Sequence, residues 1–114
     1  MKNTLIIKKN YEFKSLFSKG KFYYGEFIHI YIKKNNLSYN KLGIAISKKQ
    51  GKAVNRNRIK RLIRESYKNL EKRIEKGISI IVVINKSKEI KEISYKDIEE
   101  NFIKTLKKAN LLEE

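Results

Sequence analysis

Residues 27–64 contain eleven lysines and arginines but no aspartate or glutamate. This stretch supplies most of the net charge of +16, whereas residues 65–114 carry nearly equal numbers of basic and acidic side chains. Charges of one sign repel each other in a compact fold, so the fold must turn them outward and hold their backbone by other means. The stretch predicts a folded protein whose partner is a polyanion, and it favours nucleic acid over a membrane surface.

The length and composition predict one domain over residues 1–114, because the chain has no proline, no repeat and no linker-like segment. Cysteine is absent, which excludes disulfides, thiolate metal sites and a cysteine nucleophile. No apolar run approaches the ~20 residues of a membrane-spanning helix. The first ten residues are too short and too polar for a signal peptide, so we expect a cytoplasmic protein.

Residues 11–19 have the apolar spacing of a short helix. Phe13, Leu16 and Phe17 recur at i, i+3 and i+4 and therefore share one side. Asn10 is the expected N-cap, and Gly20 ends the helix. The spacing leaves two interpretations open for the aromatic rings, burial in the core or contact with unpaired bases.

Two segments alternate in the manner of β-strands. In residues 26–33, three isoleucines point one way, and the other way point Phe27, His29 and Tyr31. In residues 41–47, the face opposite the large aliphatic residues is small, consisting of Gly43, Ala45 and Ser47. This small face predicts a trough beside the aromatic face of the neighbouring strand. Tyr31 is expected to lean toward exposure.

The other expected elements are a short strand in the 20s, a buried strand and two more helices. Residues 78–84 form an apolar run typical of a buried strand. Ser94 and Asp97 form a capping box that opens a last helix, which ends near Lys108. The resulting order α-β-β-β-α-β-α predicts an α+β fold with a single sheet of about four strands and helices packed on it.

The basic stretch ends in a helix expected from about Asn55 to Lys76. On a helical wheel, one side is an aliphatic stripe of Ile59, Ile63, Tyr67, Leu70 and Ile74. The adjoining arc is polar and basic and consists of Asn57, Lys60, Arg61, Arg64 and Lys68. The stripe predicts docking on the sheet, which leaves the basic arc facing outward.

Cations gather at the N-terminal end of this helix, where the helix dipole is already positive. They are Arg56, Arg58, Lys60 and Arg61, preceded in the chain by Lys48, Lys49 and Lys52. This arrangement is unfavourable in isolation and becomes favourable when the helix end receives phosphates. The pattern predicts a phosphate-binding end.

The motifs favour RNA over sequence-specific DNA binding. The sequence has no helix-turn-helix pair, zinc finger or zipper. Aromatic side chains near a basic path suit unpaired bases. His29 is the only histidine and residues 27–64 hold no carboxylate, so we expect no catalytic residue and no metal site in the protein itself.

The sequence resembles the protein component of bacterial ribonuclease P. The resemblance rests on "KKNYEFKSLFSKGK" at 8–21, "KLGIAISKKQGKAVNRNR" at 41–58, "RNRIKRLIRE" at 56–65 and "GISIIVVI" at 77–84. It spans nearly the whole chain, and the block 41–65 is its most specific part. "NTLIIKKN" at the start lacks the arginines common in the family.

The resemblance implies a subunit of an endoribonuclease that removes the 5′ leader of precursor tRNA. The RNA subunit and its Mg²⁺ ions would carry the phosphodiester hydrolysis, and the fold would include a left-handed crossover around the basic helix. Phe13, Phe17 and Tyr31 would line a leader-binding cleft. The catalytic RNA would meet Lys48, Lys49, Lys52, Arg56, Asn57, Arg58, Lys60, Arg61 and Arg64, to which the basic arc adds Lys68.

Two other classes of protein share some of these features. A ribosomal or other structural RNA-binding protein would have the same charge and fold class, but it would not change cleavage by a catalytic RNA. A cationic membrane-surface protein would need an exposed apolar helix face. Here a sheet is expected to cover that face.

Overall fold

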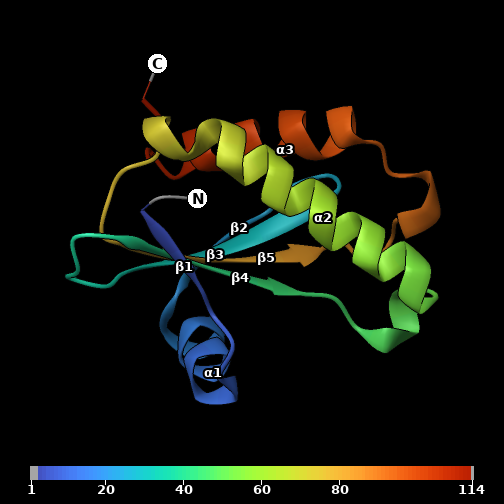
Figure 1. Cartoon of the computed structure of the whole chain (residues 1–114), viewed down its shortest axis with the longest axis horizontal. Coiled ribbons are helices and arrows are strands. Elements are labelled where there is room, and N and C mark those ends of the chain that lie inside the picture. Colours follow the sequence, from blue (N-terminus) through green and yellow to red (C-terminus); the bar gives the residue numbers. More distant parts are fainter. Residues whose placement is uncertain (1–2, 114) are drawn as a thin grey trace.

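The computed structural model describes residues 3–113 and contains one mixed sheet and three α-helices (Figure 1). The strands are β1 (Thr4–Ile6), β2 (Lys21–Tyr23), β3 (Ile28–Lys34), β4 (Asn40–Ala45) and β5 (Ile78–Ile84). The helices are α1 (Asn10–Lys19), α2 (Ala53–Leu70) and α3 (Tyr95–Lys108). Across the sheet the strands follow the order β1-β4-β5-β3-β2.

The helices cover the two faces of the sheet unequally (Figure 1). Helices α2 and α3 pack on one face, and the main core lies between them and the sheet. The other face carries only α1, whose one buried residue is Leu16. A second, small cluster forms there around Ile7, Leu16 and Ile81. Much of this second face is therefore left without a helix.

The α+β class is confirmed, but the strand count is wrong by one. Strand β5 has the predicted bounds, β3 and β4 lie within two residues of theirs, and the short strand in the 20s is β2. The missed strand is β1, which pairs in parallel with β4 through Thr4 and Asn40 at one end. Its three residues are too few to show alternation, so only the distant partner strand defines it.

Two helix boundaries differ from those predicted. Lys9 rather than Asn10 occupies the N-cap of α1, and Asn10 is the first helical residue. Helix α2 ends at Leu70 and continues as a 3₁₀ turn, Glu71–Arg73, so the predicted end at Lys76 is wrong. Ile74 lies in extended backbone and forms a β-bridge with Leu112. The capping box of Ser94 and Asp97 at the start of α3 is confirmed.

Strands β4 and β5 are parallel neighbours, and α2 is the helix that connects them. This is the βαβ crossover around the basic helix that the resemblance implies. Its left-handed sense stays an expectation from the family. The aliphatic stripe of α2 is buried as predicted, since Ile59, Ile63 and Tyr67 are fully enclosed.

A chain of buried hydrogen bonds joins β1, β4 and α2. The amide Nδ2 of Asn40 donates to the Tyr67 hydroxyl at 3.3 Å, and that hydroxyl is 2.7 Å from Oγ1 of Thr4. Thr4 donates in turn to the Glu71 carboxylate. Asn40 also accepts the Ile78 N–H at 3.0 Å. Burial raises the pKa of Tyr67, so this hydroxyl stays protonated and can donate.

None of the helices in the described part of the chain is both long enough and apolar enough to cross a lipid bilayer.

Candidate RNA-binding site

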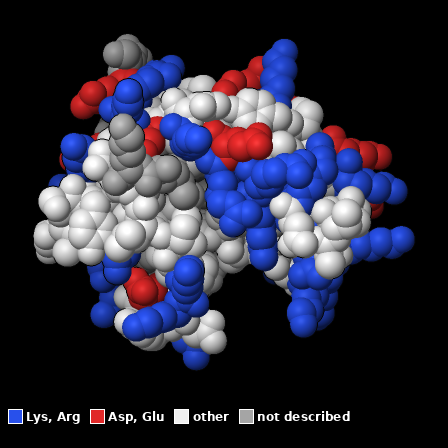
Figure 2. Space-filling model, viewed as in Figure 1, with Lys and Arg blue, Asp and Glu red and all other residues white. Residues whose placement is uncertain are grey.

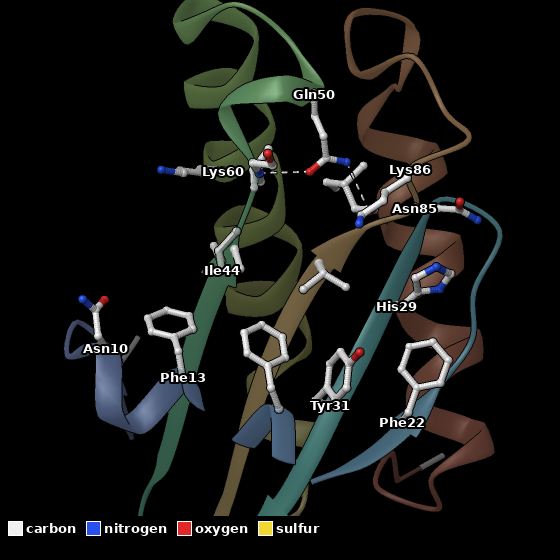
Figure 3. Close-up of a pocket in the computed structure, with 16 residues that line it drawn as sticks. Asn10, Phe13, Phe22, His29, Tyr31, Ile44, Gln50, Lys60, Asn85 and Lys86 are labelled. Atoms are coloured by element: carbon white, nitrogen blue, oxygen red, sulfur yellow. Dashed lines mark hydrogen bonds between the residues drawn. The ribbon is translucent and has the colours of Figure 1, made fainter. Parts of the chain in front are cut away.

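A cleft of about 800 Å³ lies on the face of the sheet that carries α1 (Figure 3). Its floor is a cross-strand row of side chains, Ala45 on β4, Val83 on β5 and His29 on β3. These residues are register partners, so their side chains point to the same side of the sheet. The side chains of this floor are only partly buried, whereas Ile81 in the next row is fully enclosed and packs with Leu16 of α1.

The next row across the sheet carries the aromatic wall of the cleft. Tyr31 and Phe22 are register partners on β3 and β2, with ring centroids 5.1 Å apart. From α1, Phe17 meets Tyr31 edge-on at 4.9 Å. Phe13 follows Phe17 at 6.5 Å with nearly parallel rings. The structure therefore brings the three residues predicted for the cleft, Phe13, Phe17 and Tyr31, to one wall.

The Phe13 ring of this wall packs directly against the backbone of Gly43 on β4. A Cβ atom added there would lie 2.9 Å from Cε1 of Phe13 and 3.3 Å from Cβ of Ile7, closer than side chains pack. The bare backbone of Gly43 thus admits the Phe13 ring against β4.

The predicted trough exists, although its position differs from the expectation. Strands β3 and β4 are not neighbours, because β5 lies between them. The sequence could not show this, since β5 comes much later in the chain. Phe27 also departs from the expectation, because it precedes β3 and packs against the main core, with the Lys88 ammonium 5.1 Å from its ring centroid.

The burial of the helix aromatics bears on the first of their two interpretations, packing in the core, and leaves contact with unpaired bases a prediction. Leu16 is the one buried residue of α1, and Phe13 is half-buried. Phe17 has 41% of its surface exposed. An exposed ring beside a hollow presents a free face, which core packing does not require.

The end of the cleft opposite the aromatic wall is polar (Figure 3). It is formed by Ser47, Gln50, Lys60, Asn85 and Lys86. Gln50 is fixed on both sides, because its Oε1 accepts the Ser47 N–H at 3.0 Å and its Nε2 donates to the Ile84 carbonyl at 3.3 Å. Lys60 is a residue of α2 that also lines the cleft.

A second hollow of about 800 Å³ lies beyond Gln50 and shares Ser47, Gln50 and Lys86 with the cleft. Its lining is rich in lysine and includes Lys49, Lys52, Lys86, Lys88 and Lys91. The cations after β5 were not predicted, because acidic residues accompany them in the sequence. Their position opposite Lys49 and Lys52 emerges only from the fold.

The basic surface of α2 faces outward as predicted, and Figure 2 shows Lys and Arg crowded over this region. Together with the turn that precedes α2, this surface has as its exposed members Lys48, Lys49, Lys52, Asn57, Arg61, Arg64 and Lys68. The first turn of α2 contains no acidic residue. Within residues 3–113, none of the Lys and Arg side chains of α2 is in an ion pair. Their charges are therefore available to a partner.

Two arginines of the predicted set are partly engaged inside the protein. Arg56 donates from Nε to the Gly51 carbonyl at 3.2 Å, across the turn that precedes α2. Arg58 donates from Nη2 to the Ile93 carbonyl at 2.7 Å, while its buried Nη1 has no partner among the described residues. Arg58 therefore fastens the segment before α3 to α2.

His29 lies in the cleft between two aromatic rings. Its Nδ1 accepts the Gly25 N–H at 3.1 Å, and burial lowers its pKa below the usual 6.5. Both effects favour the neutral imidazole at pH 7, with its proton on Nε2. A neutral ring in this position offers a flat face and one donor.

These features define a class of protein. A cationic helix faces outward beside a cleft with aromatic side chains on one wall, on an α+β scaffold. This combination is that of a protein that binds RNA, with a charged surface for phosphates and rings suited to unpaired bases.

Comparisons with known proteins assign the family. The family model described as ribonuclease P matches residues 1–110. The chain is 44% identical over 106 residues to the ribonuclease P protein component of Clostridium botulinum strain Loch Maree, covering 92% of this chain and 94% of that protein. It is 35% identical to that of Clostridioides difficile, covering 92% and 91%. The chain belongs to the family of ribonuclease P protein components, the protein subunits of the endoribonuclease that matures tRNA 5′ ends.

Solved structures agree with this assignment. The RNase P protein of Staphylococcus aureus superposes with a TM-score of 0.83 at 33% identity, covering 94% of this chain and 96% of that chain. The RNase P protein from Thermotoga maritima gives a TM-score of 0.81 at 31% identity, covering 90% and 94%.

Arg58 and Arg61 lie three residues apart on α2, and they should respond differently to truncation. We expect Arg58→Ala to lower the free energy of unfolding by about 1–3 kcal/mol, because the Ile93 carbonyl loses a charged donor. Arg61→Ala removes an exposed side chain and should stay within about 0.5 kcal/mol of the parent. Urea denaturation of the free protein measures both. Equal unfolding free energies for the two variants would contradict the inward role of Arg58.

Proposed function

We propose that this chain binds the RNA subunit of ribonuclease P through the basic surface of α2 and holds the 5′ leader of precursor tRNA in the aromatic cleft. The observation that carries the proposal is the continuity of the two surfaces at Lys60. Lys60 belongs to the basic helix and is also one of the residues that line the cleft. RNA on the charged surface and a leader in the cleft can therefore lie next to each other on the protein.

The cleft suits a single strand better than a duplex. Phe17 and Tyr31 expose parts of their rings beside the floor of Ala45, Val83 and His29. Every base has a face that can stack on such a ring, so the contact tolerates any leader sequence. A duplex keeps its base faces covered and gains nothing from rings in a recess.

The basic surface suits structured RNA. The residues proposed to meet the RNA subunit are Lys48, Lys49, Lys52, Arg56, Asn57, Arg58, Lys60, Arg61, Arg64 and Lys68. Double-stranded RNA is recognised mainly through its phosphates and shape, which a rigid cationic helix can follow. Guanidinium groups such as Arg61 and Arg64 grip a phosphate with two parallel donors. Of this set, Arg56 donates to the Gly51 carbonyl and Arg58 to the Ile93 carbonyl, so each would meet RNA only with its remaining donors, and the Nη1 group of Arg58 is buried.

Hydrolysis of the phosphodiester bond is assigned to the RNA subunit with Mg²⁺. The lining of the cleft has no carboxylate, and its polar groups are hydroxyl, amide, imidazole and ammonium groups. Mg²⁺ sites need carboxylate or phosphate oxygens, so the donors present here do not fit a protein-borne site. The role of the protein is binding and orientation of RNA.

Residues 1–114 would act as one RNA-binding domain. Its place of action would be the cytoplasm, where tRNA precursors and the RNA subunit meet.

Cleavage of precursor tRNA by the RNA subunit from the same organism tests this function. At low Mg²⁺, adding the protein should strongly stimulate cleavage, and the stimulation should depend on the 5′ leader. Tight binding to the RNA subunit without any stimulation would contradict the leader role. That result would make the protein a structural RNA-binding protein.

Phe17→Ala should weaken binding of leader-bearing precursor by ~1–3 kcal/mol, because one stacking face is lost. Binding of leaderless tRNA should not change. Competition binding to the assembled ribonucleoprotein measures both. Tyr11→Ala is the matched control, because Tyr11 is an exposed ring of the same helix that lines a different hollow. An equal loss of affinity for the two substrates would assign Phe17 a purely structural role.

Arg64→Ala should weaken binding to the RNA subunit and lower the slope of log K against log salt by about one phosphate contact. Lys104→Ala removes the same charge from an exposed site on α3 and should leave that slope nearly unchanged. Filter binding over a series of salt concentrations gives both slopes. Parallel slopes for the parent and Arg64→Ala would mean that Arg64 touches no phosphate.

A further inference from the structure

We propose that Phe22, His29 and Tyr24 form a second, outer stacking subsite, which takes unpaired nucleotides of the leader in addition to those held by Phe17 and Tyr31. This inference rests on the proposed function, because it needs the leader in the cleft. It adds a binding surface on β2 and on the turn between β2 and β3. The sequence pattern assigned no role to Phe22 or Tyr24 and left that of His29 open.

Five aromatic rings form a continuous series in which each ring contacts the next, in the order Phe17, Tyr31, Phe22, His29 and Tyr24. Beyond Tyr31, the Phe22 centroid lies 5.1 Å away, and the His29 ring lies 5.2 Å from Phe22. Tyr24 closes the series at 4.8 Å from His29. Phe22 and His29 line the cleft, and Tyr24 lies outside it. The rings thus extend past the edge of the hollow.

The outer rings of the series are exposed. Phe22 has 46% and Tyr24 has 59% of its surface open to solvent. A phenyl ring on an edge strand is not needed to close the core, since β2 and β3 already pair through Ile30 and Ile32, which are buried on the other face. Adjacent exposed aromatic rings mark a surface that meets a partner.

The turn that carries Tyr24 is held in place by its backbone. The Asn101 Oδ1 accepts the N–H groups of Phe27 and Ile28, each at 2.7 Å. The Asn85 Nδ2 donates to the carbonyls of Gly25 at 3.3 Å and Glu26 at 2.9 Å. A ring presented by so rigid a support loses little entropy on binding. This rigidity distinguishes a prepared binding surface from a loose loop.

A cation lies beside this outer part of the series. Lys108 of α3 donates to the Tyr24 carbonyl at 3.0 Å. Glu26, the acid of the turn, forms an ion pair with Lys88 at 3.7 Å. Ammonium groups near stacked bases can meet the phosphates between them. The surface therefore offers both of the contacts that single-stranded RNA uses.

Unpaired RNA fits this surface better than a second copy of the chain. Strand β2 is a three-residue edge strand, and pairing two such strands would bring together two molecules of net charge +16. Like charge of that size opposes self-association.

Precursors whose leaders are shortened one nucleotide at a time test the inference. The double variant Phe22→Ala/Tyr24→Ala, in the assembled ribonucleoprotein, should bind the precursor with the full leader about fivefold or more weakly than the parent. It should bind leaderless tRNA with unchanged affinity. Tyr24→Phe keeps the ring and should behave as the parent. Tyr11→Ala is the control for loss of an exposed ring elsewhere.

The outcomes separate this inference from the function on which it rests. If Phe17→Ala weakens leader binding and the double variant does so at no leader length, the outer subsite is refuted while the cleft stands. If neither variant has a leader-dependent effect, the proposed function fails first. A dimer of the free protein that the double variant abolishes would assign the outer rings to self-association and overturn the inference.

Fluorescence of 2-aminopurine gives a readout that a purely structural role would not move. Placed at successive positions of the leader, the base should be quenched on binding to the parent at one or more positions that Phe17→Ala does not affect, because it stacks there on an outer ring. The quenching should be lost with the double variant and kept with Tyr24→Phe. Quenching that persists in the double variant would contradict the proposal.

Discussion

The burial of one side of α2 against the sheet is the interaction on which the other features depend. Ile59, Ile63 and Tyr67 are enclosed there, and each such side chain contributes about 1.5–3 kcal/mol. Like charges at helical spacing on the outer side of α2, such as Arg61 and Arg64, each oppose the helix by only about 0.2–0.5 kcal/mol. The buried side therefore prevails, and a rigid helix can carry cations that would unfold a free peptide. Helix α2 connects β4 to β5, and with α2 packed in this position Lys60 lies beside the cleft.

The unequal covering of the sheet explains where the cleft lies. Two helices fill one face, while the other has α1 alone over the row that contains Gly43 and Tyr31. The next row consists of Ala45, Val83 and His29 and stays open. Small side chains on β4 thus act twice, since Gly43 admits the Phe13 ring and Ala45 leaves space beside it. The rings and the hollow arise from one alternation of small residues along one strand.

Local patterns predicted those parts of the molecule whose cause is local. The apolar run of β5, the capping box at Ser94 and the buried stripe of α2 all follow from neighbouring residues. Strand β1 could not be predicted, because Thr4, Leu5 and Ile6 become a strand only by pairing with β4. The same reason applies to Arg58, whose acceptor is a carbonyl 35 residues later in the chain. Phe22 joins the cleft only because β2 pairs with β3. The residues that the resemblance implied for the cleft did come together, which shows the geometry but leaves their contacts with RNA as a proposal.

Helix α1 crosses the face of the sheet that carries the cleft and connects the two edge strands. It leaves β1 at one edge and enters β2 at the other, and each of these strands has three residues. Its own hold on the sheet is slight, since Leu16 is its one buried residue. The aromatic wall is therefore anchored at Gly43, where the Phe13 ring packs against β4, while the two ends of the helix depend on the pairing of two short strands.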